Sequence, residues 1–280
     1  SYTKGNTDIS GGTFLGEISS RVYVDGSSEN DPVVYDKDNI DVSGGTFTEP
    51  VPAAYLEDGF TLTVGDGTYG VEEADELATV TRGEAVYNFA TLAEALTFAE
   101  DGDTVTLLDN VNENVTIAEG QNIVLDLNGY TLTNNGNAHT IYNQGKLTIV
   151  GNGTVDNINH GHAALVNYGT AELNGGKFTR SKEDGSSNSW YVILNQGTMI
   201  VNDGVEVYTA LEVSNYSSLF VNGLEGNNSY PLPSGKDNAF LTVNGGSFMG
   251  GVAAIKNDYY GILEVTGGTF GGSSTDTALQ

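Results

Sequence analysis

The sequence predicts an all-β fold, a parallel β-solenoid in which coils of about 20 to 28 residues stack on one another. Three observations lead to this prediction. A Gly-Gly corner motif recurs along the chain, short apolar strands end on asparagine at near-regular intervals, and 38 of the 280 residues are glycine. Glycine at about twice its usual share, with only 5 prolines, indicates a folded chain with many tight turns.

The corner motif consists of an apolar residue, a small polar residue, two glycines, a variable residue and a phenylalanine. Glycine adopts the positive φ angle that a sharp bend between short strands needs, and the phenylalanine returns to the interior after it. Between corners, β-branched residues alternate along the strands, as in Leu147–Val150. Five copies of the motif occur, at Ile9–Phe14, Val42–Phe47, Leu173–Phe178, Val243–Phe248 and Val265–Phe270.

The second pattern is a short apolar strand that ends on asparagine. Where such strands lie above one another in successive coils, we expect their side-chain amides to hydrogen-bond along the stack, as amides do in cross-β ladders. The five predicted ladder residues are Asn143, Asn167, Asn195, Asn215 and Asn257.

A resemblance to a known family points to the same fold. The corner motifs, together with Phe89–Leu96, the turn Asp101–Asp103 and the strand Leu125–Gly129, resemble right-handed parallel β-helix proteins of the pectin-lyase-like fold. Within that fold they are similar to the repetitive surface and adhesin-like proteins of Gram-positive, often gut-dwelling bacteria. The resemblance covers most of the chain and implies right-handed coils, but it says little about activity.

One α-helix is predicted, at residues 91–100, because Thr91 and Glu94 form a capping box and apolar residues follow at helical spacing. We expect this helix to cap the open end of the first coil, where unpaired backbone would invite aggregation. Residues 72–85 are acidic, lack the corner motif and are predicted as a linker. The linker separates residues 1–71, the final coils and closing segment of a solenoid, from residues 86–280, a solenoid that begins with the helix.

The two ends of the sequence also fit one another in register. When Leu279 and Gln280 are placed before Ser1, the interval from Leu279 to Phe14 matches the interval from Ile255 to Phe270. This match predicts that the coils continue toward residue 1 of a next copy, either in a tandem array or in subunits stacked end to end. A boundary that falls in phase by chance is the alternative.

Acidic residues dominate the charge, since 37 Asp and Glu against 10 Lys and Arg give a formal net charge of −27 at pH 7. A chain with so few cations lacks the basic surface that binds a phosphate backbone, so nucleic acid is excluded as a partner. No apolar run is long enough to span a bilayer, and we expect no membrane insertion. Because the chain has no cysteine, disulfides, cysteine zinc sites and thiol nucleophiles are excluded.

The pectin-lyase-like fold includes enzymes that cleave polysaccharides, and fragments of one catalytic pattern occur here. Asn6–Asp8, His160–Gly161 and Arg180–Lys182 resemble parts of the polygalacturonase motif set. The set is incomplete, because the sequence contains no Asp-Asp dipeptide to act as acid and base at one bond. Arg180 is also the candidate base of a calcium-dependent lyase, but we expect it in a solvated loop. We therefore predict no catalytic residues and no enzymatic activity.

No cofactor is predicted, and the metal candidates are weak. Two groups of turn aspartates offer the oxygen ligands that Ca²⁺ prefers, but neither follows the spacing of an EF-hand loop or a calcium-binding β-roll. His160 and His162 flank one glycine without an identifiable third ligand. Ordinary turns are the favoured interpretation of both features. The calcium candidates are Asp36, Asp38, Asp41, Asp101 and Asp103.

Three insertions interrupt the regular coils, at residues 17–32, 179–190 and 223–236. Long loops on a rigid solenoid are where function concentrates, so we expect ligand contacts there. Aromatic side chains in and near the insertions suit stacking on sugars, and shielding of coil edges is the equally weighted alternative. The candidate ligand-binding residues are Trp190, Tyr216, Tyr230, Tyr259 and Tyr260.

Together these patterns predict a non-enzymatic, extracellular structural or adhesive β-solenoid, secreted or on a bacterial cell surface, that forms part of a fibre or stalk. Its expected partners are copies of itself end to end, and glycans or surface proteins of the host or of bacteria. The alternative is a β-helix protein that binds or cleaves polysaccharides.

Overall fold

The computed structural model describes residues 6–19, 40–159, 161–182, 190–209, 218–223 and 237–271. In these residues the chain is an all-β parallel β-solenoid of about 7 turns with a single short α-helix, which confirms the predicted fold class. Contacts divide the chain into two compact units, residues 1–99 (unit 1) and residues 100–280 (unit 2).

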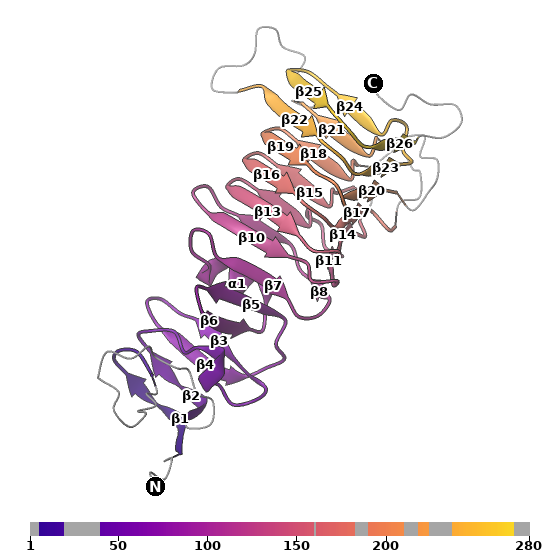
Figure 1. The fold of residues 1–280 in the computed structure, drawn as a ribbon. Helices are drawn as coiled ribbons and strands as arrows, with labels where there is room; N and C mark the ends of the chain where they lie inside the picture. Colours follow the sequence, from indigo (N-terminus) through magenta and orange to yellow (C-terminus); the bar gives the residue numbers. More distant parts are fainter. Residues whose placement is uncertain are drawn as a thin grey trace, which may run out of the picture. The chain divides into compact units, whose positions relative to one another are not determined.

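Unit 2 is a stack of coils, and successive coils contribute short strands to three parallel sheets (Figure 1). The first sheet contains β7 (Thr104–Leu107), β10 (Asn122–Asp126), β13 (Lys146–Val150), β16 (Thr170–Leu173), β19 (Thr198–Val201), β22 (Ala239–Val243) and β25 (Gly261–Val265). The second contains β8 (Val111–Asn112), β11 (Thr131–Asn134), β14 (Thr154–Asn157), β17 (Lys177–Thr179), β20 (Glu206–Tyr208), β23 (Ser247–Met249) and β26 (Thr269–Gly271). The third contains β9 (Val115–Ile117), β12 (Ile141–Asn143), β15 (Leu165–Asn167), β18 (Ile193–Asn195), β21 (Phe220–Asn222) and β24 (Ile255–Asn257).

Strands of successive coils pair in register, so that equivalent side chains lie above one another. Leu125 pairs with Ile149, and the same column continues from Ile149 to Leu173. Because alternate side chains of a strand face opposite sides, these three residues all point into the coil. All three are completely buried. The core of unit 2 therefore consists of apolar columns enclosed by the coils.

The Gly-Gly motif forms the corner between the first and second sheets. Gly176 and Gly246 have φ angles of +89° and +93°, the region that side chains disfavour. Phe178 and Phe248, which end these two copies of the motif, are completely buried. The motif thus turns the chain and supplies the core residue that follows the turn.

A ladder of asparagine side chains runs along the buried corner after the third sheet. In each bond the Nδ2 group of one asparagine donates to the Oδ1 atom of the asparagine in the next coil. The bonds run from Asn143 to Asn167 (2.6 Å), from Asn167 to Asn195 (2.7 Å), from Asn195 to Asn222 (2.8 Å) and from Asn222 to Asn257 (2.8 Å).

Asn222 takes the place in this ladder that the sequence pattern gives to Asn215. Because Asn195 bonds directly to Asn222, the ladder has no position between them. Phe220–Asn222 also has the predicted form of an apolar strand that ends on asparagine. Asn215 lies outside the described residues.

Unit 1 combines two parallel strands with antiparallel hairpins, in the order β1-β2-β4-β3-β6-β5. β1 and β2 pair in parallel, and each strand contains one Gly-Gly motif. The two motifs therefore lie one above the other. β4 then pairs antiparallel with β2, which ends the parallel stacking. The strands are β1 (Thr7–Phe14), β2 (Ile40–Phe47), β3 (Phe60–Val64), β4 (Tyr69–Glu73), β5 (Ala78–Arg82) and β6 (Ala85–Phe89), with a 3₁₀ turn at Ala53–Tyr55.

Helix α1 (Leu92–Phe98) begins at the predicted cap residue, Thr91. Thr91 Oγ1 accepts a hydrogen bond from the backbone N–H of Glu94 (3.1 Å) and donates one to the Glu94 carboxylate (3.0 Å). The buried face of α1 packs against β3, β5 and β6, all of them in unit 1. The guanidinium of Arg82 lies over the ring of Phe98 and donates to its carbonyl oxygen (3.1 Å).

Residues 72–85, for which the acidic composition predicts a linker, contain strand β5 and the end of β4. β5 forms a hairpin with β6 in which Arg82 pairs with Ala85. Gly83 turns the chain with a φ angle of +60°. The strand Ala78–Arg82 contains none of the acidic residues of this stretch, and its alternation of buried and partly buried residues is typical of a strand.

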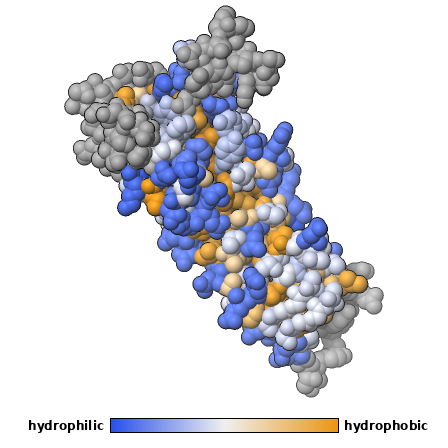
Figure 2. Space-filling model, turned by 180° about the vertical axis from the view of Figure 1, so that it is seen from behind, coloured by the Kyte–Doolittle hydropathy of each residue, from blue (hydrophilic) through white to orange (hydrophobic). Residues whose placement is uncertain are grey.

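Much of the molecular face shown in Figure 2 is hydrophilic, with apolar atoms scattered among the polar ones. Exposed large apolar residues do occur, and several of them lie in the last described coil of unit 2. Across the described stretches of the chain, no helix has the length and hydrophobicity needed to cross a membrane.

Candidate functional site

The outer face of the third sheet in unit 2 carries an apolar cluster that is separate from the interior of the coils. Val166, Leu194 and Val221 pair with one another in register, and their neighbours along each strand point inward. These three residues therefore face away from the interior, yet they are at most 3% exposed. Together with Ala163 they form the outer cluster, against which Tyr142, Trp190 and Tyr191 pack.

Trp190, the first aromatic candidate for ligand binding, is part of the covering of this outer cluster. Its ring lies 5.6 Å from the ring of Tyr191 and 5.8 Å from that of His139, measured between centroids. Tyr168 adds a further aromatic ring, 5.3 Å from Tyr142 and 40% exposed. The arrangement shields an apolar sheet face and also presents aromatic edges to solvent.

Two histidines lie beside Trp190, a grouping that the sequence pattern does not reveal. The rings of His139 and His162 meet edge to face, 5.0 Å apart. His139 Nδ1 accepts a hydrogen bond from the backbone N–H of Ala163 (2.9 Å), and His162 Nε2 lies 2.9 Å from the side-chain oxygen of Asn137. Burial, followed by the positive charge of His162, lowers the pKa of His139 to about 4. His160 lies outside the described residues.

The other aromatic candidates are not part of this group. Tyr259 and Tyr260 form the turn between β24 and β25, two strands away from β18 in the third sheet. Tyr259 is 49% exposed, and Tyr260 has a left-handed backbone with a φ angle of +61°. Tyr216 and Tyr230 lie outside the part of the chain that the structure describes.

Arg180 is completely buried, which corrects the expectation of a solvated loop. It directly follows Thr179, which pairs with Asp156, and so takes the corner position that Asn157 has in the coil before. Asp156 is itself 7% exposed and accepts hydrogen bonds from the backbone N–H (2.8 Å) and hydroxyl (2.5 Å) of Ser181. A buried guanidinium in this corner is a structural element and is shielded from a polysaccharide chain.

The calcium candidates Asp101 and Asp103 occupy a tight turn. The carboxylate of Asp103 accepts a hydrogen bond from the backbone N–H of Glu100 (2.9 Å) and is buried against it. The Asp103 carboxylate therefore stabilises the turn, which is the role that an ordinary turn gives it. Asp36 and Asp38 lie outside the described residues.

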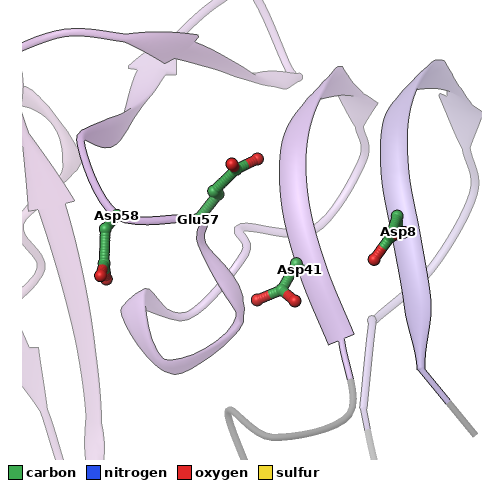
Figure 3. A pocket seen from close by; sticks show the side chains of 4 residues that line it. All are labelled: Asp8, Asp41, Glu57 and Asp58. Carbon is green, nitrogen blue, oxygen red and sulfur yellow. The ribbon is translucent and has the colours of Figure 1, made fainter.

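Asp41 contributes to an acidic pocket in unit 1 that the sequence pattern does not predict (Figure 3). The pocket has a volume of about 510 Å³, and its described lining residues are Asp8, Asp41, Glu57 and Asp58. Asp8 and Asp41 are neighbours in register on β1 and β2, an arrangement that places like charges opposite each other. Figure 3 shows that the four side chains do not converge on one point. Among the described residues, no three His, Asp or Glu side chains are placed to hold a metal ion.

Comparison of the chain with protein-family models, with curated proteins and with solved structures finds no match. The proposed function therefore rests on the fold and on the placement of the side chains. They define the class of protein as a parallel β-solenoid with an aromatic outer surface and an acidic pocket.

Proposed function

We propose that this chain is a non-enzymatic structural β-solenoid that acts as a stiff spacer and presents loops, outside the cell, either secreted or on a bacterial surface. The observation that carries this proposal is the continuity of the coil stack. Successive coils of unit 2 are joined by main-chain pairing in parallel sheets, and the asparagine ladder joins the coils from Asn143 to Asn257. Support for an extracellular location comes from the resemblance of the Gly-Gly corner motifs to those of bacterial surface proteins.

A second ladder of polar side chains adds to the stiffness of the stack. It runs along the Gly-Gly corner and joins four consecutive coils. Its bonds run from Asn202 to Asn174 (2.6 Å), from Asn244 to Asn202 (2.9 Å) and from the Thr266 hydroxyl to Asn244 (3.0 Å). Donation in this ladder runs toward the N-terminus, opposite to the direction in the buried ladder, so the amide dipoles of the two ladders oppose one another.

The proposed partners follow from the same architecture. Copies of the chain stack end to end, and loops and aromatic edges contact glycans or surface proteins. No resident cofactor is needed for this role, and the acidic chain binds divalent cations at most weakly.

Glycan binding without cleavage is the second candidate function, and the aromatic outer surface favours it. Tyr142 packs with Trp190 against the outer cluster, and the exposed ring of Tyr168 lies next to Tyr142, where it can lie flat on a sugar. If this surface binds, Tyr168→Ala reduces binding to a glycan array. Tyr259→Ala, a matched change of an exposed tyrosine on another coil, leaves that binding unchanged.

The structural role is tested by measuring release of reducing sugars and unsaturated products from a panel of acidic and neutral polysaccharides. We expect the purified chain to release no more than its heat-unfolded control. Product release that disappears in Asp41→Asn would locate an enzymatic site in the acidic pocket and overturn the proposal.

A further inference from the structure

We infer that the last described coil of one copy docks on the first coil of a second copy, with Val265 over Ile9 and Phe270 over Phe14. This inference rests on the proposed structural role and specifies the partner, the surface and the register of the end-to-end contact. Three observations carry it: exposed core positions at both coils, matching corner geometry, and a glycine without a neighbour.

The last described coil leaves its core positions uncovered. Val265 pairs with Val243 in the coil before, but Val265 is 39% exposed whereas Val243 is completely buried. Phe270 is likewise only half-buried, whereas Phe248, its neighbour in register, is completely buried. Inner coils are covered on both sides, whereas no described residue covers the core positions of this coil.

The first coil of unit 1 shows the same exposure on its opposite face. Ile9 and Phe14 are only partly buried, whereas Val42 and Phe47, their neighbours in register, are completely buried. Leu15, which follows the motif, is 85% exposed. Among the described residues, no strand covers β1 on this face, and none covers β25 and β26 on theirs.

The two faces have matching geometry. Phe14 stacks on Phe47 with ring centroids 4.9 Å apart and planes at 10°, and Phe248 stacks on Phe270 at 5.0 Å and 10°. Both stacks belong to parallel strand pairs that carry the Gly-Gly corner. A coil placed on β1 with the same spacing continues one phenylalanine column from Phe270 to Phe14.

Gly11 provides the most specific evidence. A Cβ atom added to the first glycine of the motif meets the preceding coil elsewhere: at Gly44 it lies 2.6 Å from the carbonyl oxygen of Ser10, and at Gly267 it meets that of Asn244. At Gly11 such an atom meets nothing within 4 Å, and its φ angle is not in the left-handed region. Glycine is therefore not required by the fold of unit 1 at this position. It is required if another coil docks there, because the carbonyl oxygen of Thr266 then takes the place that Ser10 has over Gly44.

Charge opposes the contact and predicts its salt dependence. In the proposed register Glu264 lies over Asp8, which already neighbours Asp41. Like charges at neighbouring positions of a sheet destabilise the pairing, and each copy also carries a net charge of −27. Because salt screens such repulsion, docking strengthens as the ionic strength rises.

Disulfide trapping tests the register, since the chain has no cysteine of its own. Thr13→Cys and Thr269→Cys are introduced on separate chains, mixed at high salt and oxidised. In the proposed register these two positions are neighbours on adjacent parallel strands, about 4.8 Å apart, which suits a disulfide. The control pair is Thr7→Cys with Thr269→Cys, because Thr7 lies at the other end of β1. We expect a disulfide-linked dimer from the first mixture and background amounts from the control and from Thr13→Cys alone.

Gly11→Ala provides the steric test. We expect this variant to keep the thermal unfolding midpoint of the parent and to reduce cross-linking between Thr13→Cys and Thr269→Cys to background. Gly44→Ala is the matched variant one coil further on, and we expect it to lower the unfolding midpoint because its Cβ atom meets Ser10. Together the two variants separate docking from folding.

The docking inference is overturned if the Thr13 and Thr269 cysteines fail to cross-link at high salt, or if Gly11→Ala cross-links as well as the parent. Either result leaves the proposed structural role intact. Release of sugars from a polysaccharide overturns the structural role whatever the yield of cross-linked dimer, so the two failures are distinguishable.

Discussion

At the scale of single residues, the buried asparagine ladder shows how one side chain fixes the spacing of coils. Asn195 is completely buried, donates from Nδ2 to Asn222 (2.8 Å) and to the carbonyl oxygen of Phe240 (2.9 Å), and accepts from Asn167 (2.7 Å). Because Asn195 is completely buried, bulk solvent does not reach these groups. A truncated asparagine therefore leaves buried donors and acceptors unpaired, which costs more than the loss of an exposed hydrogen bond.

Asn195→Ala is expected to lower the free energy of unfolding by about 1–3 kcal/mol. Asn202→Ala is the matched control in the solvent-facing ladder, where water takes over the lost bonds, and we expect a loss below about 1 kcal/mol. Urea unfolding followed by circular dichroism measures both. Equal losses of unfolding free energy for the two variants would contradict the larger contribution to stability that we assign to the buried ladder.

His139 is expected to make stability depend on pH. Its pKa of about 4 in the folded state lies below the value of about 6.5 in an unfolded chain, so the unfolded state binds more protons between these pH values. The stability that the neutral ring of His139 contributes to the folded state is fully present above pH ~6.5 and is lost as the pH falls toward 4.

His139→Asn tests this dependence, because asparagine keeps an acceptor for the Ala163 N–H but takes up no proton. We expect the difference in unfolding midpoint between the parent chain and the variant to shift in favour of the variant between pH 7 and pH 4. A difference that stays constant over this range would show that His139 does not titrate in the way its surroundings indicate.

Local sequence patterns predict the positions of some of these residues but not of others. The ladder amides could be predicted at Asn143, Asn167, Asn195 and Asn257 because each ends a short apolar strand. Asn222 was missed because Val213–Asn215 also ends on asparagine, at an interval within the expected 20 to 28 residues, so spacing alone did not separate the two candidates. Residues of the acidic pocket, such as Asp8 and Asp41, come from separate coils and meet only through the strand register.

At the scale of elements, α1 illustrates how a short helix depends on its cap. It has only 7 residues, so it contains few intrahelical bonds and relies on Thr91 at its start and on its packed face. Thr97 is its exposed threonine, and the Thr97 hydroxyl donates to the carbonyl oxygen of Ala93 (2.8 Å). The two threonines therefore allow a comparison of a capping and a non-capping side chain in one helix.

Thr91→Ala is expected to destabilise unit 1 by about 1 kcal/mol, because the backbone N–H of Glu94 loses its acceptor. Thr97→Ala is expected to be neutral or slightly stabilising, since alanine has the higher helix propensity and the backbone bonds remain. Thermal unfolding of the two variants distinguishes them. A loss in Thr97→Ala as large as that in Thr91→Ala would argue against the cap as the source of stability.

Element prediction succeeded where a motif has one geometric meaning and failed where composition was used instead. The Gly-Gly motif predicts a corner because positive φ angles select glycine, and Gly176 and Gly246 have such angles. The β5–β6 hairpin was missed because acidic residues suggested a linker. Gly83 in a two-residue loop after the alternating strand Ala78–Arg82 was the signal that would have predicted it.

At the scale of the whole molecule, the proposed role depends on a balance between apolar coil faces and a high negative charge. The faces at β1 and at β25–β26 expose residues that are buried in the neighbouring coils. The charge of −27 on each copy opposes their contact at low ionic strength. We therefore expect salt to control whether these apolar faces associate, so that assembly depends on the ionic strength.

Sedimentation velocity over a range of protein and NaCl concentrations tests the end-to-end association most directly. End-to-end docking predicts species at multiples of the 29.4 kDa monomer mass, with larger species increasing as protein and salt concentrations rise. Gly11→Ala is expected to remain at the monomer mass under the same conditions. A parent chain that stays monomeric at every salt concentration, or that dissociates as salt is added, would contradict end-to-end docking.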